Sequence, residues 1–181
     1  MLRQRAVCLA CVGAGLFILL STGVSGADDK EDTGSAVTAK EAEDLVKLHN
    51  KARKEVGVDP VKWSPKLAKH AQAWADEMAR TGKEEHNPDK TYGENIASGS
   101  GGGYSVLVGA QGWYKEKAKY KPGTPYPGKG HGVGHYTQMV WRDSTEIGVG
   151  KAVYTTGEFK GDLIIVANYN PPGNYKGEKP Y

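Results

Sequence analysis

Two runs near the end of the chain, EIGVGKAVY at residues 146–154 and LIIVANY at residues 163–169, decide the fold class. Both runs are rich in β-branched and apolar residues, and residues 155–162 between them contain two glycines. They therefore predict two strands joined by a loose turn. Pro171-Pro172-Gly173 ends the second run, because proline has no N–H to donate to a strand ladder.

Three helices are expected before this hairpin. Residues 38–56 open with a capping box, Thr38 and Glu41, and apolar residues then recur at spacings of three and four. Residues 64–82 open at Ser64-Pro65, where the serine is expected to cap the helix. A third helix is expected between Ser105 and the break at Pro122. The basic residues late in the first helix match its dipole: Lys47, Lys51, Arg53 and Lys54.

The remaining segments are loops and short turns. Residues 98–103 and 122–134 are rich in glycine and are predicted to be loops, and residues 135–141 have room for one or two helical turns. Helices beside a small, mainly antiparallel sheet indicate an α+β fold or a layered α-β-α sandwich.

The N-terminal segment, residues 1–27, has the pattern of a secretory signal. Two arginines precede an uncharged, mostly apolar run at residues 7–20, and small residues follow up to Ala27. The alternative is an uncleaved anchor, because the uncharged stretch 6–27 approaches the roughly 20 apolar residues that span a bilayer. Residues 28–37 are acidic and polar, so we expect a disordered leader before a single domain at residues 38–181.

Cleavage of the signal changes the expected chemistry of the chain. Both cysteines, Cys8 and Cys11, would be removed, so the mature domain would have no disulfide. Loss of Arg3 and Arg5 lowers the formal net charge from +3 to +1, and no basic stripe with interleaved aromatics remains. We therefore expect a protein secreted to the extracellular or periplasmic space, with no nucleic-acid partner and no stable membrane insertion.

The residues that could carry chemistry are dispersed. The sequence has no phosphate-binding glycine loop, no paired-cysteine metal motif and no His-Glu-x-x-His helix. Two histidines and two glutamates stand out by their surroundings: His86, Glu94, Glu116 and His135. Together they could hold a divalent cation such as Zn²⁺, with imidazole as the main ligand. The simpler interpretation is a solvated loop histidine, exposed carboxylates and glycines that ease a turn.

Several motifs resemble the CAP superfamily, named for cysteine-rich secretory proteins, insect venom antigen 5 and plant pathogenesis-related protein 1. The similarity extends from about Glu41 to Tyr175. The segments that carry it are Leu48–Arg53 (LHNKAR), Tyr92–Ala97 (YGENIA), Trp113–Glu116 (WYKE), Gly134–Trp141 (GHYTQMVW) and Ile165–Asn174 (IVANYNPPGN).

This resemblance implies a three-layer α-β-α sandwich with a large cleft, in which the two His and two Glu face one another. It makes His86, His135, Glu94 and Glu116 the expected ligands of a divalent cation, Zn²⁺ or Mg²⁺. Members of the superfamily differ in activity, and some bind sterols or fatty acids, so the fold does not define the function.

Three functional hypotheses follow. The favoured one is a secreted, non-catalytic binding protein that holds a divalent cation at the four residues and a lipid or other small ligand in the cleft, with Tyr120, Tyr126 and Gln138 as ligand-binding residues. The second is a metal-dependent, protease-like hydrolase in which Glu94 or Glu116 activates water. The third is an extracellular interaction or adhesion module with a cell-surface partner.

Overall fold

The structure, a computed structural model, describes residues 32–181. The predicted signal at residues 1–27 lies outside the described residues. Among those described, no helix has the length and apolar character needed to cross a membrane. The elements are α1 (Ala39–Glu55), β1 (Lys62–Trp63), α2 (Pro65–Thr81), β2 (Gly93–Gly99), α3 (Val106–Lys115), the 3₁₀ helix η1 (Glu116–Lys119), α4 (Gly134–Met139), β3 (Glu146–Val153) and β4 (Leu163–Asn170).

A four-stranded sheet of order β1-β3-β4-β2 forms the middle of the molecule. The predicted hairpin is confirmed: β3 and β4 pair antiparallel, from Glu146 opposite Asn170 to Val153 opposite Leu163. Two strands were not expected from the sequence: β2, which pairs antiparallel with β4, and β1, which pairs parallel with β3. Residues 98 and 99, expected in a loop, end β2. The sheet is therefore mainly antiparallel, as expected.

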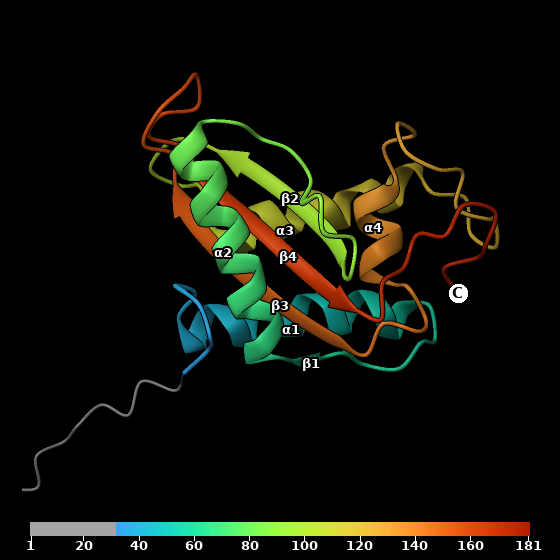
Figure 1. The fold of residues 1–181 in the computed structure, drawn as a ribbon. Helices are drawn as coiled ribbons and strands as arrows, with labels where there is room; N and C mark the ends of the chain where they lie inside the picture. Colours follow the sequence, from blue (N-terminus) through green and yellow to red (C-terminus); the bar gives the residue numbers. More distant parts are fainter. Residues whose placement is uncertain (1–31) are drawn as a thin grey trace, which may run out of the picture.

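Helices cover both faces of this sheet and complete an α-β-α sandwich (Figure 1). Helix α2 packs on β3 and β4 alone on one face, whereas α1, α3 and α4 contact one another on the other face. Two glycines of β3 allow the close approach of α2: a Cβ on Gly148 would lie 2.1 Å from the Ala68 nitrogen, and one on Gly150 would lie 2.3 Å from the Gln72 nitrogen. The α+β class and the layers are confirmed.

Most helix boundaries match the expectation, with two corrections. The capping box of α1 forms between Thr38 and Glu41. Ser64 precedes Pro65 in extended conformation, but its side chain makes no capping hydrogen bond, so proline at the first helical position starts α2. The third helix ends at Lys115 and continues only as the 3₁₀ turn η1.

The expected disordered leader is wrong for its last residues, because Thr33–Val37 are tied to the domain. Ser35 Oγ donates to the Val149 carbonyl at 2.7 Å, and the Thr33 carbonyl accepts from Trp63 Nε1 at 3.0 Å. Val37 is fully buried. The polar composition suggested disorder, but the hydroxyls satisfy backbone groups and a single valine anchors the segment.

Candidate functional site

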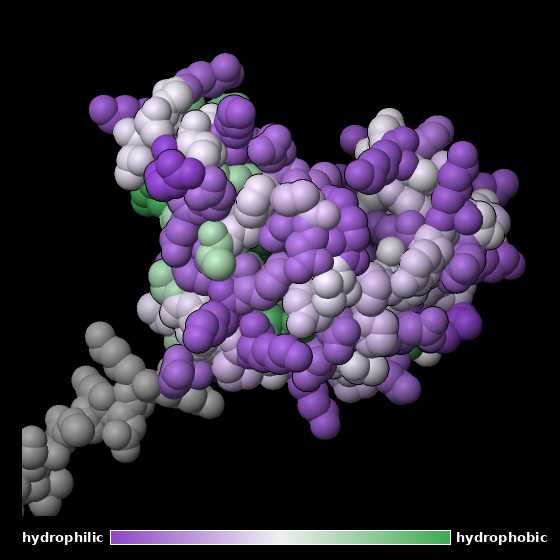
Figure 2. Space-filling view, viewed as in Figure 1, coloured by the Kyte–Doolittle hydropathy of each residue, from purple (hydrophilic) through white to green (hydrophobic). Residues whose placement is uncertain are grey.

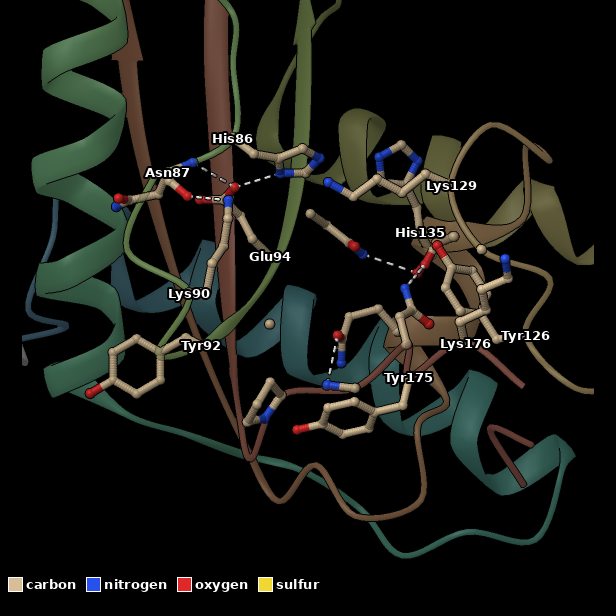
Figure 3. A pocket seen from close by; sticks show the side chains of 18 of the residues that line it. His86, Asn87, Lys90, Tyr92, Glu94, Tyr126, Lys129, His135, Tyr175 and Lys176 are labelled. Atoms are coloured by element: carbon tan, nitrogen blue, oxygen red, sulfur yellow. Dashed lines mark hydrogen bonds and ion pairs between the residues drawn. The ribbon is translucent and has the colours of Figure 1, made fainter. Parts of the chain in front are cut away.

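A cavity of about 850 Å³ opens beside the ends of β2 and α4. The segment before β2, the loop 120–133, the N-terminus of α4 and the segment after β4 contribute its walls. The cavity brings the four expected residues, His86, Glu94, Glu116 and His135, into one lining. In Figure 3 the labelled residues His86 and Glu94 lie on one side of the cavity and His135 on the other.

Glu94 and His86 form the first pair. Glu94 is the second residue of β2, where pairing with Asn168 of β4 fixes its backbone. Its Oε1 atom lies 2.6 Å from His86 Nδ1 and accepts from the Asn87 backbone N–H at 3.1 Å. The Glu94 side chain is 9% exposed and the His86 side chain 45% exposed. Glu94 Oε2 is buried and has no hydrogen-bond partner.

Glu116 and His135 form the second pair. Glu116 Oε1 lies 2.8 Å from His135 Nδ1, and Glu116 Oε2 accepts from the backbone N–H groups of His135 and Tyr136. Glu116 therefore also caps the first turn of α4. Burial opposes ionisation of Glu116, but the hydrogen bonds from His135 and from these backbone groups outweigh it and hold its pKa below the ordinary value.

The two pairs have the same chemistry. A carboxylate accepts hydrogen bonds, so the neutral imidazole beside it carries its proton on Nδ1 and keeps the lone pair on Nε2. The pairs do not merge into one cluster: in residues 32–181, no three His, Cys, Asp or Glu side chains are grouped as a metal site. The arrangement is two carboxylate-oriented imidazoles on a shared cavity.

A buried chain of hydrogen bonds leads from His49 to the backbone carbonyl of His135. His49 Nε2 lies 2.9 Å from the Tyr169 hydroxyl, which accepts from Asn95 Nδ2 at 3.1 Å. Asn95 also donates to the His135 carbonyl at 3.0 Å. This chain links α1, β4 and β2 to α4 and fixes the backbone of His135. Asn95 belongs to the YGENIA motif, but its role in this chain was not predicted from the sequence.

The three expected ligand-binding residues have different positions. Tyr126 and Gln138 line the cavity. Gln138 is buried, and its side chain accepts from the Gly173 N–H and donates to Ser144 Oγ. It therefore links α4 to the segments before β3 and after β4. Tyr120 does not line the cavity; its ring packs on Tyr136 and Tyr181. The structure therefore does not bring Tyr120 to the site.

The lysines of the lining were not among the predicted site residues: Lys90, Lys129 and Lys176. Each is a single lysine in a different loop, with no motif around it. Only the fold brings them together.

The three layers and the cavity with two His–Glu pairs define a CAP domain. Consistent with this, the profile of the CAP cysteine-rich secretory protein family matches residues 46–169, and the chain belongs to that family. It is similar to pathogenesis-related protein 1A of Nicotiana tabacum, with 37% identity over 77% of this chain and 80% of the relative. Pathogenesis-related protein 1 of Arabidopsis thaliana is 40% identical over 77% of this chain and 81% of the relative.

Solved structures agree on the fold. BmVAL-1 is similar with a TM-score of 0.65 and 25% identity, over 82% of this chain and 84% of its own. NaASP2, solved with Zn²⁺, has a TM-score of 0.67 and 22% identity, over 80% of this chain and 86% of its own. At that identity the second similarity concerns the fold alone.

Proposed function

We propose that this protein is a secreted binding domain whose cavity holds a divalent cation through His86 and His135. The observation that carries the proposal is the matched pair of imidazoles, each with a glutamate oxygen at Nδ1. In a neutral ring this arrangement leaves the lone pair on Nε2, where it can bind a cation. Carboxylate–imidazole pairs of this kind orient metal-ligating histidines and make them more basic.

The chemistry of these donor groups suits a cation such as Zn²⁺. Imidazole nitrogen is a preferred zinc ligand, and the buried, unpartnered Glu94 Oε2 supplies negative charge beside the first imidazole. When bound, the cation would attract electron-rich groups of a ligand. His86 and His135 would hold it, while Glu94 and Glu116 would orient the rings. Two protein nitrogens leave positions open, which suits a binding site that takes a ligand in the same cavity.

Secretion is part of the proposal. It rests on the signal pattern of residues 1–27 and on the relationship to the pathogenesis-related proteins. The hydrolase alternative is less well supported, because two histidines provide fewer protein ligands than the three of a usual catalytic zinc site. Glu116 also uses both oxygens to hold His135 and the first turn of α4. The lipid-binding and adhesion hypotheses remain predictions.

Calorimetric titration with Zn²⁺ and Mg²⁺ tests the proposal. The purified protein should bind Zn²⁺, and the double variant His86→Ala/His135→Ala should lose this binding. His131→Ala is the matched control, because His131 is exposed in the adjacent loop but does not line the cavity.

A second variant separates ligands from the residues that orient them. Glu94→Gln/Glu116→Gln keeps both imidazoles and should weaken zinc binding by about 10–100-fold. Circular dichroism must show that each variant is folded. Zinc binding that persists unchanged in the folded double-histidine variant would place the metal elsewhere and refute the proposed site.

A further inference from the structure

Three lysines from separate parts of the chain converge on the cavity. Lys90 comes from the segment before β2, Lys129 from the loop 120–133, and Lys176 from the segment after β4. All three are labelled in Figure 3, where they stand around the cavity that His86 and His135 also line. Figure 2 shows a surface that is largely hydrophilic, in agreement with this lining.

Within residues 32–181, these lysines form no ion pair with a carboxylate. Four other lysines of residues 32–181 form ion pairs, but Lys90, Lys129 and Lys176 form none, and Lys90 donates only to the Asn87 carbonyl. The acidic groups of the cavity have nearer partners. Glu94 and Glu116 hold the two histidines, and Asp89 accepts from the N–H and hydroxyl of Thr91. The three carboxylates of the lining balance its net charge, but they do not pair with these lysines, so the three ammonium groups remain free to contact a ligand.

An exposed aromatic residue, Tyr175, precedes Lys176 in the cavity lining. Tyr175 lines the cavity and is 49% exposed, although it is a large and mostly apolar side chain. Its ring packs edge-on against the buried Trp141, with the ring centroids 5.9 Å apart and an interplanar angle of 67°. This contact holds the ring in place while leaving part of its surface open. A fixed, exposed aromatic ring of this kind offers an apolar surface with a polar end.

We infer that the cavity binds an anionic saccharide: a sugar ring lies against Tyr175, and its charged groups meet Lys90, Lys129 and Lys176. The volume of about 850 Å³ falls within the range of roughly 300–1,000 Å³ typical of small-molecule sites. Ammonium groups and an exposed ring suit an anionic sugar better than an acyl chain, since an apolar chain would leave the lysines unpaired. The inference rests on the proposed use of this cavity as a binding site, but it needs no metal.

Calorimetry in EDTA with three probes tests the inference. Sucrose octasulfate supplies rings and charge, sucrose supplies rings alone, and tripolyphosphate supplies charge alone. Sucrose octasulfate should bind and sucrose should not, and the affinity should fall as ionic strength rises because the lysines are exposed. Replacing Lys90, Lys129 and Lys176 together by alanine should weaken sucrose octasulfate binding by about tenfold or more.

Matched variants distinguish a built site from general charge attraction. Lys66, Lys69 and Lys160 are exposed and lie outside the cavity, so their triple alanine variant makes the same change in net charge. It should leave the affinity within about twofold. Tyr175→Ala should weaken sucrose octasulfate binding more than tripolyphosphate binding.

Three results would overturn the inference. They are no binding of sucrose octasulfate, equal losses in the two lysine variants, and equal effects of Tyr175→Ala on the two anions. A protein that binds sucrose octasulfate in EDTA but fails to bind zinc would refute the metal site alone. A protein that binds zinc through His86 and His135 but not sucrose octasulfate would refute the saccharide alone.

Discussion

Arg53 offers the sharpest test of how the sequence holds this fold together. It lies in α1, is 1% exposed, and forms no ion pair with a carboxylate of residues 32–181. Its five N–H groups donate to five backbone carbonyls at 2.5–3.3 Å, those of Asp59, Met139, Trp141, Arg142 and Ser144. Burial lowers the pKa of Arg53 to about 10, so the guanidinium is still charged at pH 7. Arg53 therefore links α1 by hydrogen bonds to the segment between α4 and β3.

Replacement of Arg53 by methionine keeps most of the side-chain volume and removes all five donors. Single hydrogen bonds from charged groups contribute about 1.5–3 kcal/mol each and do not add. A buried carbonyl left without a donor costs about 1–3 kcal/mol, and five such costs do not add in full because the structure relaxes. We therefore expect the free energy of unfolding to fall by about 3–5 kcal/mol, which corresponds to a decrease in Tm of about 10–15 °C. Arg53→Lys keeps the charge but not the five-donor fork, so its loss should be smaller.

Urea denaturation followed by circular dichroism measures this loss. Lys54→Met is the matched control, because Lys54 is the neighbouring residue of α1 and is exposed; its effect should stay within about 0.5 kcal/mol. A loss below about 1 kcal/mol for Arg53→Met would show that water or backbone rearrangement satisfies the five carbonyls, and the reasoning would be wrong.

Two further predictions concern stability. Burial lowers the pKa of His49 to about 4, so the unfolded chain binds one more proton than the folded chain between about pH 6.5 and pH 4. The free energy of unfolding should fall by up to about 3 kcal/mol as the pH decreases through this range. Urea denaturation at several pH values measures this dependence, and His49→Gln should remove the part that His49 causes. An unchanged pH dependence in the variant would exclude His49 as its source. Gly148→Ala places a Cβ 2.1 Å from the Ala68 nitrogen and should cost about 1–3 kcal/mol or more, whereas Gly112→Ala, in open space on α3, should stabilise by about 0.5–1 kcal/mol. Thermal unfolding compares the two, and equal effects would contradict the close packing of α2 on β3.

The sequence predicted the helices and strands that have a regular pattern of hydrophobic residues. The amphipathic spacing of α1 and α2 and the β-branched runs of β3 and β4 are local signals. Strand β2 was not predicted because Gly93–Gly99 contains two glycines, an asparagine and a serine, which are poor strand formers. It becomes a strand because it pairs with β4 along its whole length. Arg53 was assigned to the helix dipole for a related reason. Arginine is usually a surface residue, and four of the five carbonyls that accept from Arg53 belong to residues 139–144, far along the chain.

The contacts within the candidate site were even harder to predict from local sequence patterns. Resemblance to the CAP superfamily selected His86, Glu94, Glu116 and His135, and the structure places all four on one cavity. No spacing in the sequence indicates that each glutamate pairs with its own histidine, because the partners are 8 and 19 residues apart and meet through β2 and α4. Lys90, Lys129 and Lys176 carry still less signal, since isolated loop lysines are ordinary surface residues. Their convergence depends on three loop paths, so the ligand class follows from the three-dimensional arrangement of the loops rather than from the motifs that identify the family.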